Sequence, residues 1–491
     1  MSQGNGQEFK KSLRLVDATS MVIGSMVGSG IFIVSADMAR NLGSPGWLLV
    51  AWAVTAVMTT FAALSFGELA GMMPHSGGIY VYLREAYSPL FGFLYGWTIF
   101  MVIQTGSIAA IAMAFSRFLG VIIPWIAEDN YLIHIGAFSL NTTKLIAIFM
   151  IVFLTWVNSK GIEEGKIIQN IFTFLKVGII LVFVIIGFMF IKAPVPLDWH
   201  AASFWKAEAI RNGSIVPLAG QSLLAGLGIA MVGSLFASDA WYNVTFASGE
   251  VINPRRTIPI SLFLGTFLVG LLYFLVNVVY VKALPLKGIA DGADVLSRGI
   301  QFASEDRVAT AVMYDILGKS AAIVMALVVM ISTFGCNNGM VISGPRLYYA
   351  MSNDGVFFKA AGKLNKHGVP AIGLFLQAIW SIVLCLSGSY SEMLDYVIMA
   401  VMLFNVLVIT AIFVLRVKRP GADRPYKAFG YPVIPALYIL MSVFVLITIL
   451  IYKPEYTWPG FVIVAMGVPV FYIWRGIRKK RDNRDAMKQS V

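Results

Sequence analysis

The sequence predicts an all-α protein that crosses a membrane twelve times. Of its 491 residues, 58% are hydrophobic and 13% are charged, and the mean hydropathy is +0.79. A typical soluble domain carries about 25% charged residues. Apolar runs of about 18 residues or more, each long enough to span a bilayer, recur from one end of the chain to the other. This pattern leaves no room for a large soluble domain.

Twelve apolar runs separated by polar connections are the predicted spans. The third and eighth are longer than a perpendicular helix needs, so we expect them to be tilted. The longest connections cover 119–141, 192–221 and 282–318, and the last is mixed enough in composition for a short surface helix. The predicted spans are residues 16–40, 46–72, 88–118, 142–159, 166–191, 222–247, 258–281, 319–350, 369–387, 394–416, 433–452 and 457–475.

The distribution of basic residues predicts that both ends of the chain lie in the cytoplasm. With residues 1–15 inside, about two thirds of the 37 Lys and Arg fall on the cytoplasmic side, as the positive-inside rule requires. The basic tail, residues 476–491, is then an orientation signal that is compatible with contact to anionic lipid, and nucleic-acid binding is not expected. Because the chain shows no cleavable signal peptide or other targeting signature, we expect an integral protein of a bacterial inner membrane.

Sequence motifs argue against several other classes of protein. The two cysteines, Cys336 and Cys385, lie inside apolar runs and form no disulfide or metal-ligand pattern. All four histidines fall in connections, and the chain contains no HExxH, GxSxG or phosphate-binding loop. An intramembrane enzyme, an ATP-driven pump, a metal centre or another cofactor is therefore not expected. A channel stays open as an alternative, because channels also use polar residues within their spans.

The first span contains the stretch GSMVGSGIFIV, residues 24–34, which a continuous helix in lipid disfavours. Met21–Met26 can form a helix, Gly28-Ser29-Gly30 offers a place to unwind, and Ile31–Ala39 resumes the helix. A break exposes amides at the new N-terminus and carbonyls at the broken C-terminus. These ends suit a substrate that carries one carboxylate and one ammonium. The alternative is that small residues allow two helices to pack closely.

The sixth span is interrupted at the corresponding place. Small and polar residues, among them Gly233, Ser234, Ser238 and Asp239, occupy its middle. Transporters with inverted repeats carry broken helices at matching positions of two halves, with the binding site between them. We therefore expect spans 1–5 (residues 16–191) and 6–10 (222–416) to be repeats joined by an extracytoplasmic loop over 192–221, followed by two added spans within 417–475.

Five motifs resemble the amino acid–polyamine–organocation (APC) superfamily, and most closely the L-type amino acid transporter group and its bacterial relatives. They occur in the family's order, and the resemblance covers roughly residues 13 to 455. It implies a LeuT-like fold and transport of amino acids by alternating access, as a sodium-independent exchanger or a proton-coupled symporter. The motifs are GSMVGSGIF (24–32), FGELAGMMPHSGGIYVYLREAY (66–87), GKIIQNIFTFLKVG (165–178), FASDAWYNVTFASGEVINPRRTIP (236–259) and STFGCNNGMVISGPRLYYAMSNDG (332–355).

The resemblance places a substrate site at the two breaks. It implies that backbone amides and the Ser29 hydroxyl receive the substrate carboxylate, that the Met26 carbonyl receives the ammonium, and that Phe236 closes the site from outside. Asp239 is an ionisable residue at mid-membrane, and we favour a structural role for it at the break over direct substrate contact. The expected substrate-binding residues are Met26, Ser29, Gly30, Ile31, Gln104, Phe236, Ala237, Ser238 and Asp239. For Gln104, hydrogen bonding between helices is the alternative.

Lys176 lies about ten residues into the fifth span, too deep to reach water easily. In the families that the chain resembles, a lysine here takes the place of a sodium ion, and Ser332 and Thr333 stand at the matching stretch of the eighth span. Lys176 is then either a cation that titrates during transport or a static strut.

We expect a small or medium neutral L-amino acid as substrate, with cationic amino acids or polyamines as the alternative. No cysteine lies between spans three and four, so a disulfide-linked partner is not expected.

Overall fold

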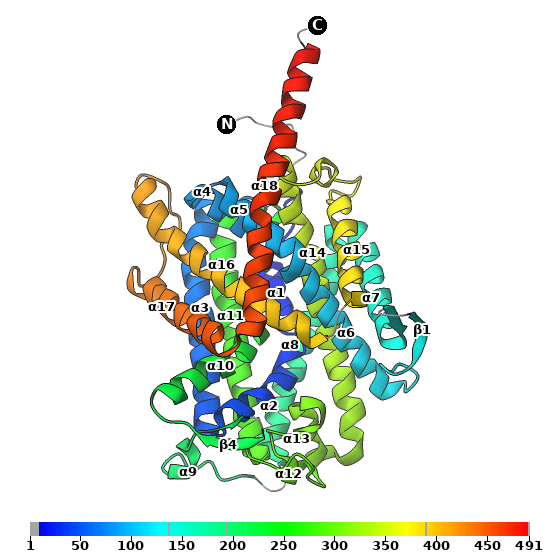
Figure 1. Cartoon of the computed structure of the whole chain (residues 1–491), viewed down its shortest axis with the longest axis vertical. Coiled ribbons are helices and arrows are strands. Elements are labelled where there is room, and N and C mark those ends of the chain that lie inside the picture. The colour runs from blue at the N-terminus through cyan, green and yellow to red at the C-terminus, as the bar shows by residue number, and fades with distance from the viewer. Residues whose placement is uncertain (1–8, 136–137, 192–193, 212, 388–389, 490–491) are drawn as a thin grey trace.

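The computed structural model describes residues 9–135, 138–191, 194–211, 213–387 and 390–489, which form a single bundle of helices (Figure 1). The helices are α1 Leu15–Met26, α2 Gly30–Leu42, α3 Pro45–Met72, α4 Ile79–Ala86, α5 Pro89–Thr98, α6 Gln104–Ile122, α7 Thr142–Ser159, α8 Ile162–Phe190, α9 Ala202–Trp205, α10 Gln221–Ala237, α11 Pro254–Ala283, α12 Val295–Arg298, α13 Val308–Leu317, α14 Ala321–Asn353, α15 Ala371–Ser387, α16 Tyr390–Lys418, α17 Val433–Tyr452 and α18 Pro454–Gln489. A π-helical turn, η1 Ile99–Ile103, joins α5 to α6, and the 3₁₀ segment η2 Trp241–Glu250 follows α10. Three shorter 3₁₀ turns are η3 Ser304–Asp306, η4 Gly318–Ser320 and η5 Lys359–Gly362.

In the described part of the chain, ten helices are long and apolar enough to cross a membrane, counting α10 with η2 as one span. The pair α1 and α2, which meet at an angle of 42°, passes the same test as one broken span, and α15 is a shorter apolar helix of 17 residues. Two predicted spans, 142–159 and 433–452, coincide with α7 and α17. The last helix is longer than predicted, because α18 continues through most of the predicted tail to Gln489.

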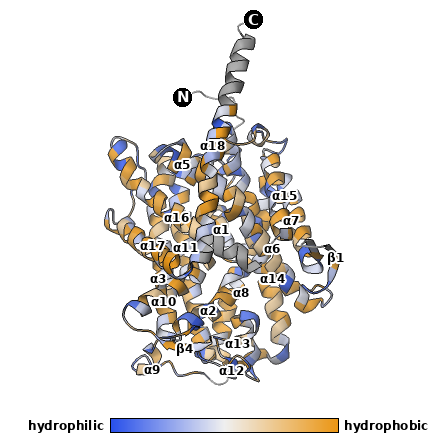
Figure 2. Ribbon diagram, viewed as in Figure 1, coloured by the Kyte–Doolittle hydropathy of each residue, from blue (hydrophilic) through white to orange (hydrophobic). Residues whose placement is uncertain are grey.

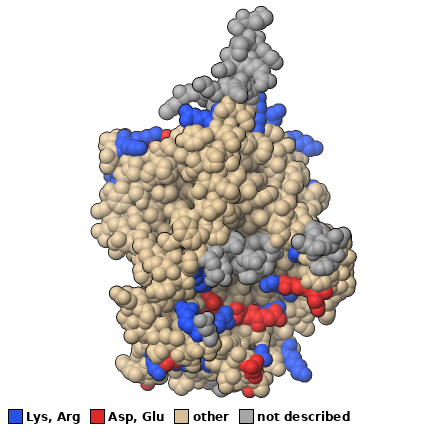
Figure 3. Space-filling model, in the orientation of Figure 1, with Lys and Arg blue, Asp and Glu red and all other residues tan. Residues whose placement is uncertain are grey.

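The surface of the bundle agrees with a protein that lies in a bilayer. Hydrophobic residues dominate the middle of the helices, and hydrophilic residues gather in the connections (Figure 2). On the face seen in Figure 3, a broad band almost without charged side chains separates two charged ends. Lys and Arg predominate at the end where α14 and α18 end, which we call the basic end. Acidic and basic side chains mix toward the opposite end, where α12 and α13 lie, which we call the mixed end.

The prediction of an all-α protein needs one correction, because two connections contain small antiparallel hairpins. Strands β1 Tyr131–Ile135 and β2 Phe138–Asn141 pair before α7, and β3 Glu208–Arg211 pairs with β4 Ser214–Pro217 before α10. Each strand has only four or five residues and lies outside the apolar runs. The surface helix expected within 282–318 is present, as α12 and α13.

The segment before α1 is bound to the end of η2. Backbone amides of Ser12 and Leu13 donate to the Glu250 carbonyl at 2.9 and 3.0 Å, and the Ile252 amide donates to the Leu13 carbonyl at 2.8 Å. The ring of Phe9 packs edge-on against Tyr349 of α14, with centroids 4.9 Å apart. The start of the first span and the end of the sixth therefore meet at the basic end.

Candidate functional site

The first break separates α1, which ends at Met26, from α2, which begins at Gly30. Val27 adopts an extended conformation with φ −80° and ψ 94°, so the helical hydrogen-bond pattern stops there. The chain therefore unwinds where the glycine and serine pattern predicts. Carbonyl groups of the last turn of α1 and amides of the first turn of α2 both lose their partners within the helix.

Lys176 of α8 supplies a cation to the carbonyl end of this break. Its Nζ donates to the carbonyls of Gly24 and Val27, both at 2.8 Å, and to the Ser332 carbonyl of α14 at 3.2 Å. The side chain is 1% exposed. All three protons of the ammonium are therefore used. The contacts join α8 and α14 to the end of α1.

Three further side chains satisfy the remaining carbonyls. The Ser332 hydroxyl lies 3.1 and 2.9 Å from the carbonyl oxygens of Val27 and Gly28. The Cys336 thiol donates to the Ser25 carbonyl at 3.0 Å, and the Tyr273 hydroxyl of α11 donates to the Met26 carbonyl at 3.3 Å. The carbonyl that the resemblance assigns to a substrate ammonium thus has a protein partner here, although an oxygen keeps a second lone pair.

The amide end of the break faces the second broken helix. Ser29 precedes the first turn of α2, and the amides of Gly30 and Ile31 belong to that turn. A Cβ built on Gly30 would lie 2.8 Å from the Cβ of Ala237 and 3.1 Å from its Cα. Glycine is therefore required where α2 crosses the end of α10, because real Cβ atoms do not approach that closely.

The second break is a tight turn between α10 and η2. Amides of Ser238 and Asp239 donate to the carbonyls of Ser234 and Phe236 at 3.0 and 3.2 Å. Ala240 has φ 65° and ψ 5°, a left-handed conformation that is unfavourable for a residue with a side chain. The Tyr242 hydroxyl donates to Asp239 Oδ2 at 3.3 Å. Asp239 therefore has a partner one turn along its own segment.

The two breaks line one small cavity of about 40 Å³. Six of the predicted site residues contribute to its wall: Met26, Ser29, Gly30, Phe236, Ala237 and Asp239. The remaining lining residues are Ser25, Gly28 and Ala240 at the breaks; Ser107, Ala110 and Ile111, which belong to α6; and Cys336 and Met340, which belong to α14. The cavity thus has walls from α1, α2, α6, α10 and α14, with the first-break amides and Asp239 both within it.

The other six predicted residues do not line this cavity; Lys176 and Ser332 bind the carbonyl end of the first break, as described above, and four lie elsewhere. Ile31 and Ser238 are buried beside the breaks, and the Ile31 carbonyl accepts from the Tyr280 hydroxyl at 3.0 Å. Gln104 donates to the Met340 carbonyl at 2.6 Å, which is the helix-to-helix bond considered as its alternative. The Thr333 hydroxyl donates to the Val329 carbonyl of its own helix at 2.7 Å, and none of the contacts described for it involves the Lys176 ammonium.

Two wall residues of α14 were not predicted, because helical spacing groups them with Ser332 but does not by itself orient them toward the cavity. Cys336 and Met340 follow Ser332 at intervals of four, so the three residues share one face of α14. Ser107 of α6, by contrast, was not missed: it forms with Gln104 and Thr105 a polar patch that the sequence indicates as a possible substrate contact, and it lines the cavity. The predicted helix faces contained these positions, but the rotation of each helix was needed to select them.

Larger cavities open at both ends of the molecule. One of about 860 Å³ at the mixed end shares Ser29 with the central cavity. The other, of about 730 Å³ at the basic end, shares no lining residue with it. Buried aromatic residues of η2, including Trp241, Tyr242 and Phe246, lie between the central cavity and the basic end. In this conformation the central cavity is therefore approached from the mixed end.

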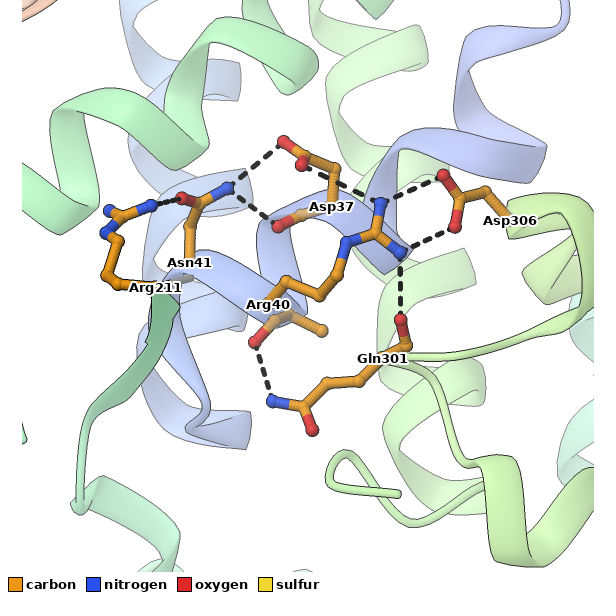
Figure 4. A network of polar contacts seen from close by, with 7 residues as sticks. Asp37, Arg40, Asn41, Arg211, Gln301 and Asp306 are labelled. Atoms are coloured by element: carbon orange, nitrogen blue, oxygen red, sulfur yellow. Dashed lines mark hydrogen bonds and ion pairs between the residues drawn. The ribbon is translucent and has the colours of Figure 1, made fainter. Parts of the chain in front are cut away.

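A polar network fixes the outer part of α2 at the mixed end (Figure 4). The Arg40 guanidinium donates to both carboxylate oxygens of Asp306 at 2.6 and 2.9 Å and to the Gln301 carbonyl at 2.9 Å. Asn41 receives a hydrogen bond from Arg211 of β3 at 2.8 Å. This network joins α2 to the two connections before α10 and α14.

Comparisons with known proteins agree with this architecture. The family model described as "Amino acid permease" matches residues 13–473. The b(0,+)-type amino acid transporter 1 of Mus musculus is 28% identical over 466 residues, covering 94% of this chain and 88% of the mouse protein. The human cystine/glutamate transporter is also 28% identical, with 96% and 87% covered, as is the mouse large neutral amino acids transporter small subunit 2, with 96% and 82% covered.

The match extends over nearly the whole chain and includes both broken helices and the lysine-bearing α8. It confirms the resemblance recognised in the sequence motifs and identifies a family of transporters rather than enzymes. The chain is therefore a member of the amino acid permease family within the APC superfamily.

Proposed function

We propose that this protein is a secondary transporter of small or medium neutral L-amino acids that works by alternating access. The observation that carries the proposal is a small cavity shared by the two broken helices, which puts helix-end amides and carbonyls in one place. A zwitterionic amino acid backbone complements both ends. The twelve-span count and the arrangement of two inverted five-helix repeats, with α15 as one span, belong to the same proposal.

The substrate carboxylate would bind at the start of α2. Gly30 and Ile31 provide first-turn amides, and the Ser29 hydroxyl lines the same cavity. The ammonium would face the carbonyl end of the first break, where the second lone pair of the Met26 oxygen can accept. Phe236 lines the cavity from α10 and is partly exposed, so it would cover the substrate from the mixed end without a polar contact.

Lys176 would take the place of a sodium ion. Its ammonium holds three carbonyls at 2.8 to 3.2 Å, which is the arrangement that a bound cation would need. A second cation in the same pocket would be strongly repelled. Transport would therefore be independent of sodium and would run as exchange or be coupled to protons.

Side-chain selectivity depends on the size and charge of the cavity. A volume of about 40 Å³ favours a small side chain unless the walls move. The second candidate, a cationic amino acid, is favoured by one observation: Asp239 lines the cavity with a carboxylate. The names of the relatives cover b(0,+)-type, large neutral, and cystine and glutamate substrates, so they support amino acids as a class.

Uptake into proteoliposomes tests these proposals together. Purified protein is loaded with an unlabelled neutral amino acid, and uptake of a labelled one is measured against a panel of neutral, cationic and anionic competitors. We expect neutral L-amino acids to compete best and initial rates to stay nearly unchanged when potassium or choline replaces sodium. A steep sodium requirement would overturn the role given to Lys176, and no counterflow with any amino acid would overturn the function.

Phe236→Ala distinguishes a gate from a wall residue. A gate acts when the substrate is enclosed, so we expect turnover to fall more than binding affinity. Lost affinity with unchanged turnover would make Phe236 a part of the binding wall instead.

Orientation, membrane and partners complete the proposal. The basic end would face the cytoplasm, and the mixed end would face outside, in agreement with the excess of Lys and Arg at the end where α14 and α18 end. A bacterial inner membrane is the proposed location. Both cysteines are buried, which supports function without a disulfide-linked partner.

A further inference from the structure

The cavity at the basic end is lined by an excess of positive charge. It lies between the segment before α1, the connection before α4, the junction of η2 with α11, and the end of α14. Its charged lining residues are Lys11, Arg84, Arg255, Arg256 and Asp354. Four basic side chains therefore face one carboxylate across a volume of about 730 Å³.

Two of these four cations are paired with carboxylates. Arg84 pairs with Asp354 and also lies 3.0 Å from Glu85, and Arg255 pairs with Asp423 at 2.8 Å. In the part of the chain that the structure describes, Lys11 and Arg256 form no ion pair. Both are exposed, so their charges act on the contents of the cavity.

The cavity at the mixed end is different. Its two lining arginines are each paired, Arg117 with Glu128 at 2.5 Å and Arg307 with Glu305 at 2.6 Å. Asp306 also lines it and is paired with Arg40 at 2.6 Å. Three carboxylates thus face two guanidinium groups, and the charges are balanced by close partners.

Under the proposed alternating access, the two cavities lie on the two approaches to the central site, of which only the mixed-end one meets it in this conformation. The mixed-end cavity reaches it at Ser29, and the basic-end cavity lies where α1 starts and η2 ends, the halves of the broken helices on that side. A cleft lined by one sign of charge raises the local concentration of oppositely charged solutes and lowers that of like-charged ones. The local concentration of a charged amino acid would therefore differ between the two approaches, whereas that of a neutral amino acid would be the same in both.

We propose that the basic-end cavity is a charge filter, in which Lys11 and Arg256 disfavour cationic amino acids and favour anionic ones during loading from the cytoplasmic side. This inference rests on the proposed function and its orientation. At about 10 Å in water, two unit charges change the local concentration of a monovalent solute by about fourfold. Since both side chains are exposed, the effect must weaken as salt shortens the Debye length.

The test compares L-arginine with L-citrulline, which has nearly the same shape without the charge. Oriented vesicles of both kinds, right-side-out and inside-out, report apparent affinity for each compound at either face, as substrate or as inhibitor of neutral uptake. At low ionic strength we expect the ratio of arginine to citrulline affinity to be about fourfold lower at the cytoplasmic face than outside. This difference should fall toward one at high salt.

Charge variants assign the effect to the cavity. The double variant Lys11→Gln with Arg256→Gln should make the arginine-to-citrulline ratio equal at the two faces. Arg256→Glu alone lowers the charge of the cavity by the same two units, so it should raise the cytoplasmic ratio by a similar factor. Lys363→Gln is the matched control, because this exposed lysine lies in the connection between α14 and α15 and does not line the cavity. It should leave the ratio unchanged.

The outcomes separate this inference from the function beneath it. Absence of any amino acid counterflow would contradict the proposed function. If citrulline or another neutral amino acid is carried, two results would overturn the charge filter: an equal ratio of arginine to citrulline affinity at both faces, or arginine that neither is transported nor inhibits at either face. A ratio that Lys363→Gln changes as much as the double variant does would overturn it as well.

Discussion

The break between α1 and α2 is held by side chains from three other helices, whereas the break between α10 and η2 is held largely by its own residues. At the first, Lys176, Ser332 and Tyr273 contribute hydrogen bonds from α8, α14 and α11. At the second, the turn is closed by local backbone bonds, and Asp239 is bonded by Tyr242 three residues along.

This difference predicts how strongly substitutions at each break will affect transport. Hydrogen bonds from α8, α11 and α14 meet at the first break. Movement of any of these helices against α1 must therefore stretch or break those bonds. The second break is closed mainly by hydrogen bonds within its own segment, so movement of distant helices affects these bonds less directly. Changes at the first break should therefore damage transport more than changes at the second.

Lys176→Met removes the main support of the first break and should have the largest effect. A methionine of similar length removes the Lys176 hydrogen bond to the Gly24 carbonyl and leaves the Val27 carbonyl with the Ser332 hydroxyl alone. An unsatisfied buried group costs about 1 to 3 kcal/mol. We expect initial uptake to fall by at least about tenfold and the apparent melting temperature to decrease. Lys166→Met on the same helix is the control, since Lys166 pairs with Glu163 at 2.5 Å away from the break. Near-normal uptake by Lys176→Met would show that the ammonium is dispensable.

Gly30→Ala tests the point where the two broken helices touch. The added Cβ would lie 2.8 Å from the Ala237 Cβ, so α2 and α10 must separate. Overpacking of this kind costs about 1 to 3 kcal/mol, and we expect substrate affinity to drop by about tenfold. Ala237→Gly in the same chain should restore part of it. Gly178→Ala, where nothing lies within 4 Å of the new Cβ, is the control. Wild-type affinity in Gly30→Ala would mean that this contact does not shape the site.

The variants Ser332→Ala and Thr333→Ala compare two adjacent hydroxyls on α14. Ser332 reaches the carbonyls of Val27 and Gly28 across the break, whereas Thr333 bonds only within its own helix among the contacts described. Loss of a single hydrogen bond of this kind costs about 1 kcal/mol, so uptake should decrease by about fivefold. Thr333→Ala should have less than half that effect on a logarithmic scale. Equal effects of the two variants would remove the distinction between them.

Ala240→Gly should have the smallest effect and the opposite sign. Glycine accepts the left-handed conformation at φ 65° without steric cost, while alanine pays about 1 kcal/mol there. We expect a slightly higher apparent melting temperature, by about 1 to 2 °C, with uptake nearly unchanged. A large loss of uptake would show that the second break depends on the stiffness of Ala240 and is less independent than the comparison states.

Local chemistry explains how much of this molecule the sequence predicts. Hydrophobic runs must be as long as a bilayer is thick, so α7 and α17 end where the predicted spans 142–159 and 433–452 end. Gly28 to Gly30 and Ser238 to Asp239 interrupt such runs with residues that weaken a helix, and both breaks occur there. Two short hairpins escaped prediction because four residues carry too little pattern to separate a strand from a loop.

Contacts between distant helices were decided by the tertiary structure alone. The sequence by itself determined that Lys176 is a cation buried in an apolar span, but only the packing of α8 against α1 and α14 decided that its partners are Gly24, Val27 and Ser332. Packing also rotated Thr333 toward its own helix and Cys336 into the cavity wall. Helical spacing fixes which residues share a face, whereas the direction of that face depends on surfaces far away in the chain.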